Sequence, residues 1–509
     1  MLKELVRATR GVRWSLLSSI CAFACLILAI IFADTQPAYT LPPPHSIRAI
    51  PAFARKYGVP CSACHTAWPE LNNFGQVFRD NGFQMMNDRD SPIWQNPSYF
   101  PITFRITPNW HRESTDHQPV DGAPAGGGTV LVHGFDLSGL DIWTAGTLFK
   151  NVSFSVLPSS NNLATFHFEN AWVRFDNLLK SPWLNIKFGK FELDNLISEK
   201  RFLFLSANGG LYQNYHFLPV GDFGGFNGTL NTNNFGLGDN QLGVELAGHS
   251  TNSYRRYSVA LLSGNEGQVG VPANRGYDGY FTFSQAFQLG KLGLQRVGAY
   301  YYVGRRPTFF QTSGGTAIAG TGMGNKSFYR AGLAGDLFLG KFEFLPFYLH
   351  GWDSAFLGTG TAANAQLPAG ARAPTWNGGF IETHYYYNPQ LVFTGRYEII
   401  RMSRQAFPGP APGATTCTES DPTNPCAQSN LGNIDAYSVG YRWYPIMFSR
   451  AGLAFHNEYS LVKTLGATPL SGNGAGLAPL TSLQSTTCSL TSCRGVWSSS
   501  VFIGFDLDF

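Results

Sequence analysis

From residue 99 onward, apolar and polar residues alternate with a period of two. In the stretch ITFRIT (102–107), the apolar residues fall on one face and the polar residues on the other. The same alternation recurs in LNIKFGKF, QLGVELAG, KFEFLPFYLHGW, DAYSVGYRWYP and VFIGFDLDF. Successive side chains of a β-strand point to opposite faces, so this pattern predicts strands with one apolar and one polar side. About sixteen strands are expected, over 99–112, 129–147, 152–158, 166–177, 183–192, 240–250, 255–263, 277–289, 293–305, 326–338, 341–352, 375–388, 389–402, 433–445, 450–463 and 494–509.

The lengths of the links between these segments predict how the strands are arranged. Very short links, at 148–151, 251–254, 290–292, 339–340 and 388–389, alternate with long ones, at 113–128, 193–239, 306–325, 353–374, 403–432 and 464–493. Short turns on one side and long loops on the other are typical of outer-membrane β-barrels. Residues 99–509 are therefore predicted to form a porin-like transmembrane β-barrel of about sixteen strands. An even strand number places both ends of the barrel on the periplasmic, short-turn side.

The end of the chain and the composition favour the same fold class. Apolar residues occupy every second position from Val501 to Phe509, and the chain stops on that aromatic residue, as barrel proteins of bacterial outer membranes commonly do. A soluble β-sandwich is the alternative. Charged residues make up only 13% of the chain and aromatic residues 15%, and a sandwich with solvated outer faces carries more charge. The fold is thus predicted to be mainly β and embedded in lipid.

Residues 1–33 are interpreted as a signal peptide. Four basic residues and Glu4 precede or flank an apolar run from Trp14 to Phe32, and Ala33 and Ala38 offer cleavage sites. An uncleaved anchor is the alternative. Cleavage after Ala33 removes four of 36 basic and one of 32 acidic residues, so the remaining chain is nearly neutral and nucleic-acid binding is not favoured. Export and a barrel together predict the outer membrane of a Gram-negative cell. Residues 34–50, between the signal peptide and residue 51, are predicted to be a Pro-rich tether.

The sequence Cys61-Ser62-Ala63-Cys64-His65 is a pattern for covalent haem attachment. In this pattern two thiols add to the haem vinyl groups and the following histidine binds the iron. Thioredoxin-type redox sites and zinc sites also use Cys-X-X-Cys. The first needs a βαβ setting and the second needs two further ligands nearby, and the surrounding sequence offers neither. One haem c bound by Cys61, Cys64 and His65 is therefore predicted.

Residues 51–98 are expected to form a small α-helical cytochrome segment. A helix is predicted from Pro69 to Asn81, with Leu71, Phe74 and Phe78 on one face. The apolar cover of the haem is expected from five aromatic residues, Phe53, Tyr57, Trp68, Phe74 and Phe83. So small a unit cannot enclose a haem alone. We therefore expect the segment to lie in the barrel lumen, where the wall completes its pocket.

The second axial ligand of the iron remains open among several side chains. Met85 and Met86 follow the predicted helix, and a thioether ligand would raise the reduction potential. His45 in the tether is the alternative and would lower it. Either methionine could instead serve ordinary packing. Three histidines on early strands could also reach a luminal haem, namely His111, His133 and His167.

Four cysteines form two close pairs in loops that the topology places outside the cell. Cys417 pairs with Cys426 and Cys488 with Cys493 in the predicted arrangement. In an exported protein such pairs favour disulfides over free thiols. A metal site is the poorer interpretation, because no histidine flanks either pair at ligand spacing.

The haem segment resembles that of a known family. Pro51-Ala52-Phe53-Ala54-Arg55 precedes the haem cysteines, and PELNNFGQVF (69–78) follows them. Both stretches are similar to the amino-terminal segment of the fused monohaem cytochrome–porins of iron-oxidising bacteria, over about thirty-five residues. The resemblance implies a barrel that oxidises dissolved Fe(II) at the cell surface. It also implies that the electrons pass to a periplasmic c-type cytochrome or another carrier.

Three functions follow from these observations. The first is inward electron transfer from Fe(II) or another extracellular donor. The second is a diffusion porin in which the haem is structural or plugs the pore. The third is outward delivery of electrons to an extracellular acceptor, which a low midpoint potential would indicate. The sequence contains no acid–base or nucleophile constellation that would favour a hydrolase.

Overall fold

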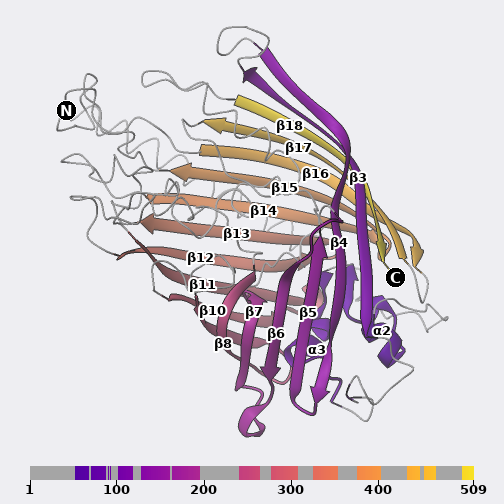
Figure 1. Ribbon diagram of the computed structural model, residues 1–509, viewed down its shortest axis with the longest axis vertical. Helices are drawn as coiled ribbons and strands as arrows, with labels where there is room; N and C mark the ends of the chain where they lie inside the picture. Colours follow the sequence, from indigo (N-terminus) through magenta and orange to yellow (C-terminus); the bar gives the residue numbers. More distant parts are fainter. Residues whose placement is uncertain are drawn as a thin grey trace.

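Sixteen antiparallel strands close into one barrel (Figure 1). The computed structural model describes residues 52–67, 70–86, 90, 92, 101–118, 128–160, 163–194, 240–263, 277–307, 325–353, 375–402, 433–447, 452–465 and 496–508. The strands are β3 (Ile102–Gln118), β4 (Gly128–Phe149), β5 (Val152–Ser160), β6 (His167–Phe175), β7 (Asn185–Glu192), β8 (Asn240–His249), β9 (Arg255–Leu262), β10 (Asp278–Gln288), β11 (Leu294–Pro307), β12 (Asn325–Leu339), β13 (Phe342–Asp353), β14 (Thr375–Asn388), β15 (Leu391–Met402), β16 (Asn433–Met447), β17 (Gly452–Leu465) and β18 (Val496–Asp508). Each pairs with its neighbours in sequence, and β18 pairs with β3 to close the wall.

The predicted number of strands is confirmed, and most of their ends agree within a few residues. The largest difference is in β3, which was expected to stop at residue 112 and continues to Gln118. Hydroxyl pairs support this polar extension. Ser114 Oγ lies 2.8 Å from Ser499 Oγ, and Thr115 Oγ1 lies 2.7 Å from Ser498 Oγ. Residues 113–118 lack apolar alternation and were therefore predicted to belong to a loop. Hydrogen bonds between polar side chains accompany the strand here.

The links between strands alternate in length as expected. One end of the barrel carries the links 150–151, 176–184, 250–254, 289–293, 340–341, 389–390 and 448–451. The other end carries 119–127, 161–166, 193–239, 263–277, 308–324, 354–374, 403–432 and 466–495, which are long except for 119–127 and 161–166. The cysteines at 417, 426, 488 and 493 lie outside the described residues, so their disulfides remain predictions.

The two faces of the wall have opposite chemistry. On β16, the outward side chains Tyr437, Val439 and Trp443 are about half exposed, whereas the inward Ser438 and Arg442 are buried. Other strands repeat this arrangement, because consecutive residues face opposite sides. The outer face is therefore an apolar surface of the kind that contacts lipid. The inner face carries the charged and hydrogen-bonding side chains.

None of the helices formed by the described residues is long and apolar enough to cross a membrane.

Residues 52–86 form a small segment on the inner face of the wall, near the short links. It comprises α2 (Ala52–Tyr57), the 3₁₀ turn η1 (Cys61–Ala63), β1 (His65–Ala67), β2 (Glu70–Leu71) and α3 (Asn73–Asp80). In Figure 1, α3 lies behind β4, β5 and β6. Its contacts are with inward-facing residues such as Arg174, Arg256 and His384. This position agrees with the expected luminal location.

The helices of this segment differ from the prediction in three respects. The helix expected from Pro69 begins only at Asn73, because Glu70 and Leu71 pair as a strand with residues 65–67. Phe74 was expected on the buried face and is 44% exposed, whereas Phe78 is buried. The predicted end at Asn81-Gly82 is confirmed, with Gly82 at a φ of 72°. The short helix α2 was not predicted.

Candidate functional site

The two cysteines of the haem pattern lie on one tight turn, and His65 begins β1 directly after it. Residues Cys61–Ala63 form η1, and the backbone N–H of Cys64 donates to the carbonyl of Cys61 at 3.1 Å. Both cysteines are half-buried and neither forms a disulfide. Burial raises the pKa of the Cys64 thiol to about 11, with a smaller contribution from Cys61. This environment does not produce the low-pKa thiolate that a dithiol redox site uses.

The imidazole of His65 is oriented by the backbone of the same segment. Its Nδ1 lies 3.2 Å from the carbonyl oxygen of Glu70, brought there by the pairing of β1 with β2. Because a carbonyl oxygen only accepts, this contact assigns the proton to Nδ1 and the lone pair to Nε2. A ligating histidine usually donates its other N–H to such a partner. The local geometry of His65 therefore fits iron ligation.

Helix α3 packs directly on the cysteine turn through Asn72 and Gly75. The Asn72 side chain accepts from the Gly75 N–H at 3.0 Å and donates to the Ala63 carbonyl at 3.1 Å, while its own N–H donates to the Cys64 carbonyl at 3.0 Å. A Cβ on residue 75 would lie 2.1 Å from the Cys64 carbonyl oxygen. Only glycine permits this approach. The spacing of Asn72 and Gly75 thus fixes the position of the cysteine turn.

An aromatic cluster joins the segment to the wall. Its buried members Tyr57, Phe78, Phe83 and Ala145 are covered by partly buried side chains, namely Phe53, Val59, Met85, Trp143 and Trp172. The Phe53 ring lies 4.9 Å from the Phe83 ring and 6.4 Å from that of Trp143 on β4. The Phe83 ring stacks at 6.0 Å on Trp172 of β6.

Three of the five predicted cover residues belong to this aromatic cluster. They are Phe53, Tyr57 and Phe83. Phe74 lies outside this cluster and is exposed, and Trp68 lies outside the described residues, so their role as haem cover stays a prediction.

The candidates for the second axial ligand differ in burial and in whether the structure describes them. Met85 packs against the aromatic cluster, and its backbone N–H donates to the Asp90 carboxylate at 2.7 Å. Met86 is 53% exposed, and His45 lies outside the described residues. The identity of this ligand stays a prediction.

The three strand histidines do not converge on one place. His111 faces inward on β3, with its Nε2 2.9 Å from Glu113 Oε1 and 3.0 Å from Ser500 Oγ. His133 and His167 are exposed. The structure therefore does not bring His133 or His167 to a shared luminal site with His111.

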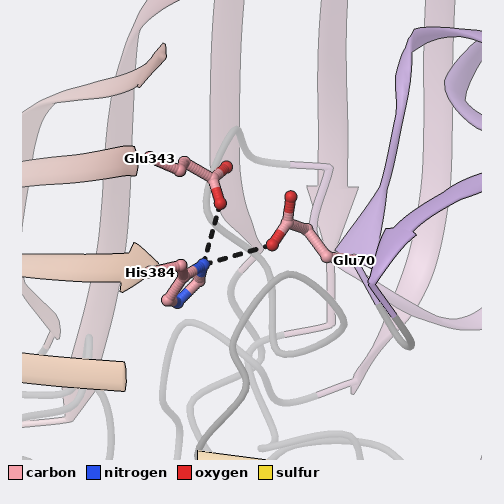
Figure 2. A group of neighbouring side chains, drawn as sticks. All are labelled: Glu70, Glu343 and His384. Carbon is pink, nitrogen blue, oxygen red and sulfur yellow. Dashed lines mark hydrogen bonds and ion pairs between the residues drawn. The ribbon is translucent and has the colours of Figure 1, made fainter. Parts of the chain in front are cut away.

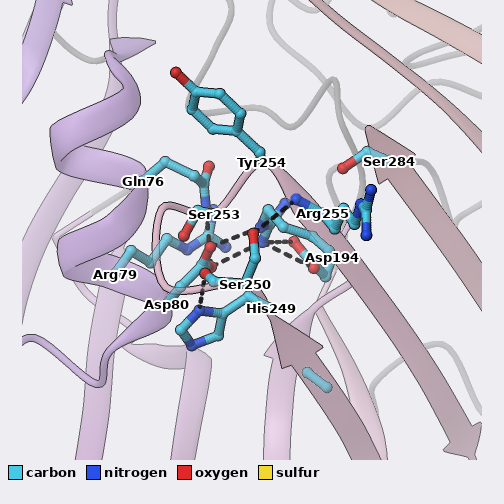
Figure 3. A network of polar contacts seen from close by, with 12 residues as sticks. Gln76, Arg79, Asp80, Asp194, His249, Ser250, Ser253, Tyr254, Arg255 and Ser284 are labelled. Atoms are coloured by element: carbon cyan, nitrogen blue, oxygen red, sulfur yellow. Dashed lines mark hydrogen bonds and ion pairs between the residues drawn. The ribbon is translucent and has the colours of Figure 1, made fainter. Parts of the chain in front are cut away.

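An ion-pair network binds the end of α3 to the wall (Figure 3). Asp80 accepts from Arg256 Nε at 2.8 Å and Nη2 at 3.0 Å, and Arg256 also contacts Asp194 at 2.8 Å. Arg174 Nη2 donates to the carbonyls of Arg79 and Asp80 at 2.9 and 3.1 Å. These carbonyls lie at the helix C-terminus, where a cation is favoured by the helix dipole. The wall thus caps α3 and also holds its last side chain.

The electrostatics of Asp80 follow from this pairing. Burial alone would raise the pKa of its carboxyl group. The charges of Arg256 and His249 and the hydrogen bonds from Arg256 and Ser253 together outweigh burial, so the pKa lies well below the usual range. Asp80 is therefore ionised at neutral pH.

A second buried cluster connects β2 to the opposite part of the wall (Figure 2). His384 Nδ1 lies 2.8 Å from Glu343 Oε2 and 3.2 Å from Glu70 Oε2. The Tyr386 hydroxyl donates to Glu70 Oε2 at 2.6 Å. Glu343 and His384 are direct partners in the register of β13 and β14. Because the Glu70 carbonyl faces His65, this residue links the haem-motif histidine to the wall.

Reasoning from the sequence missed the wall residues that hold the segment. They are Trp143, Trp172, Arg174, Arg256, Glu343 and His384. One available signal was their position, since each lies on the inward face of a strand near a short link. Their partners are far away in sequence, and no local pattern identifies them.

Comparison with known proteins yields only distant similarity. No protein-family model and no curated protein sequence matches this chain. The anion-selective porin of Comamonas acidovorans is 10% identical, with 80% of this chain and 99% of that chain covered and a TM-score of 0.46. Outer-membrane expressed OmpT of Vibrio cholerae is 10% identical over 80% and 97%, with a TM-score of 0.43. OprB of Pseudomonas putida is 9% identical over 79% and 94%, with a TM-score of 0.41. The residues of this chain must therefore carry any assignment of function.

Proposed function

We propose that this chain is an outer-membrane barrel that carries one haem c on Cys61, Cys64 and His65. In this proposal it transfers electrons from an extracellular donor such as Fe(II) to a periplasmic carrier. The observation that carries the proposal is the geometry of His65, whose Nδ1 faces the Glu70 carbonyl directly after a turn that holds both cysteines. A haem bound there would supply a one-electron site whose potential depends on ligation and burial.

The residues of the chain support such a group in three ways. Asn72 and Gly75 orient the cysteine turn against α3. The aromatic cluster excludes water between the segment and β4–β6. The ion pair of Asp80 with Arg256 holds the segment against the wall. Together these contacts give a short segment the enclosure that it cannot provide alone.

The location of the segment favours electron transfer across a membrane. The hydrocarbon core of a bilayer is about 30 Å thick, and protein of that thickness insulates. A redox group on the inner wall divides this distance into shorter gaps. The apolar outer face of the barrel fits lipid, and the signal-like residues 1–33 fit export to the outer membrane. The short-link end is the side on which a periplasmic carrier would dock.

A diffusion porin is the second candidate, because the sixteen-stranded closed barrel is compatible with a channel. In an open water-filled lumen, inward side chains would be solvated. Here the inward Tyr302 and Arg330 have an exposed fraction of 0%, and Phe380 of 5%. Buried luminal side chains argue against a wide, water-filled channel at these positions.

The test is a spectroelectrochemical titration of the full-length protein extracted from membranes, followed by rapid mixing with Fe(II). The haem should remain attached after acid-acetone extraction, and the Cys61→Ala, Cys64→Ala double variant should lose it. Fe(II) should reduce the haem. A haem that stays oxidised in excess Fe(II) would exclude iron oxidation. A low midpoint potential would indicate outward flow, and conductance in planar bilayers with a redox-silent haem would identify a porin.

A further inference from the structure

We propose that Glu70, Glu343 and His384 bind a divalent transition-metal ion that joins the haem segment to the barrel wall. The site is separate from the haem ligands, and the inference does not depend on whether a haem is attached. The three side chains are almost completely buried, with exposed fractions of 2%, 1% and 0%. One ligand atom from each lies within 4.8 Å of the other two.

The distances within the site suit the shell of a small cation. His384 Nδ1 lies 2.8 and 3.2 Å from the two Oε2 atoms of Glu343 and Glu70. Ligand bonds of about 2.0–2.2 Å separate neighbouring donor atoms by roughly 3 Å, so these contacts match adjacent positions around one ion. All three side chains point to one place, and they come from β2, β13 and β14 (Figure 2).

The far side of the imidazole supplies an independent argument. His384 Nε2 lies 2.7 Å from Glu382 Oε1, which is itself completely buried. A carboxylate accepts this hydrogen bond, so Nε2 carries the proton. Nδ1 also faces carboxylate oxygens, so this side of the ring holds a positive charge, either a proton on Nδ1 or a metal ion shared with the two carboxylates. Histidines that bind metal are commonly oriented by a carboxylate in this way.

The charge balance of this cluster also favours a bound metal ion. Burying carboxylates close together is costly unless positive charge compensates them. Among the described residues, the cationic partners of Glu70 and Glu343 are limited to the His384 ring, which also contacts Glu382. Glu343 also hydrogen-bonds a further acidic side chain, that of Asp336. One imidazolium cannot neutralise three carboxylates. Arg396 reaches only Glu382 in this group, at 3.5 Å. A divalent ion restores the balance for Glu70 and Glu343.

The donor set indicates the class of metal. Two carboxylates and one imidazole suit Zn²⁺, Mn²⁺ and Fe²⁺, whereas a site for Ca²⁺ or Mg²⁺ is built from oxygen ligands. Tyr386 hydrogen-bonds both carboxylates and so fixes their orientation. Because Glu70 belongs to the segment and the other two ligands to the wall, the ion would fasten the two together.

The experiment uses Zn²⁺, which has no redox chemistry and therefore does not depend on electron transfer. Metal-depleted full-length protein in detergent is dialysed against increasing Zn²⁺, and the bound metal is measured by mass spectrometry. The wild type should bind one more tight Zn²⁺ than Glu343→Gln. Glu382→Gln should weaken that site by about 10- to 100-fold. The cysteines are present in every variant, so any zinc bound by thiols cancels in the comparison.

Glu113→Gln is the matched control. Glu113 is also a buried carboxylate beside an imidazole, that of His111, and the described contacts give it no second carboxylate. This variant should bind Zn²⁺ like the wild type. Equal binding by the wild type and Glu343→Gln would overturn the proposal and indicate that the two carboxylates share a proton instead. Should Glu343→Gln fail to fold, the zinc X-ray absorption spectrum of the Cys61→Ala, Cys64→Ala variant decides, because it lacks these two thiols. The proposal requires an imidazole and oxygen shell, and its absence would overturn the proposal.

Discussion

Replacing Asp80 by Asn tests how the segment is held in the lumen. Asp80 makes two hydrogen bonds to Arg256 and accepts one from Gln76 Nε2 at 2.9 Å, all of them buried. Asparagine has nearly the same volume, so packing is retained. The change removes the negative charge and leaves a buried guanidinium with Asp194 as its remaining carboxylate partner.

The free-energy cost of the Asp80→Asn change follows from the burial of the Asp80–Arg256 ion pair. Removing one partner of a buried ion pair costs about 3–5 kcal/mol. Because Asp194 still compensates Arg256, we take the lower limit, about 3 kcal/mol. Since every 1.4 kcal/mol is a tenfold change, the fraction of molecules with an undocked segment should rise by roughly a hundredfold. The barrel itself should persist, because none of its strand pairings includes residue 80.

Limited proteolysis of the folded protein in detergent measures this change directly. Cleavage within residues 52–86 should be about a hundredfold faster in Asp80→Asn, while electrophoretic heat-modifiability shows an intact barrel. The control is Asp435→Asn, which breaks an exposed ion pair with Arg401 and should have little effect. Equal cleavage rates in the wild type and Asp80→Asn would show that the ion pair does not hold the segment.

Three further outcomes follow from the structure. Gly75→Ala places a methyl group against the Cys64 carbonyl at a cost of about 1–3 kcal/mol and should lower the haem-to-protein ratio in pyridine haemochrome assays, whereas Gly134→Ala, with open space at its Cβ, should not. The pKa of Asp80 is lowered on folding, so its contribution is complete above the unfolded pKa of about 4 and is lost only as the pH falls through the lower folded value. Protease resistance of the segment should thus be constant from pH 8 to pH 5, and a loss at pH 6 would contradict this account. Val439→Arg puts a charge on the outer face in the middle of β16 and should destabilise the barrel by about 2–4 kcal/mol in urea titrations in lipid vesicles, and no loss would mean that this face does not contact lipid.

The strands could be predicted because their signal is local. Alternation in a stretch such as 435–445 reflects one apolar and one buried polar face, and the closed barrel has this arrangement throughout. The assignment of Cys61, Cys64 and His65 to a haem rests on their spacing and stays a prediction. Helix α3 was placed too early, because Pro69 is a good first helical residue and the pairing of Glu70 and Leu71 with β1 cannot be read from their own stretch.

The contacts that position the segment could not be predicted for a physical reason. The bond from Arg174 to Asp80 joins residues 94 positions apart, and that from His384 to Glu70 joins residues 314 apart. Such contacts depend on the curvature and register of the whole wall. A lone charge on a strand predicts only an inward or outward side. Its partner is known only when the barrel is closed.

The attachment of the segment to two parts of the wall has a consequence for biogenesis. Asp80 is held by β9, and Glu70 by β13 and β14, on strands that are distant in the barrel order. The two sets of contacts can form together only once the sheet has curved enough to bring β9 and β13–β14 around the segment. A barrel inserted without its segment would leave Arg256 and His384 each with one fewer carboxylate in its interior. Maturation of the segment and insertion of the barrel are thus expected to be coupled, so that the cell exports an empty barrel only at a loss of stability.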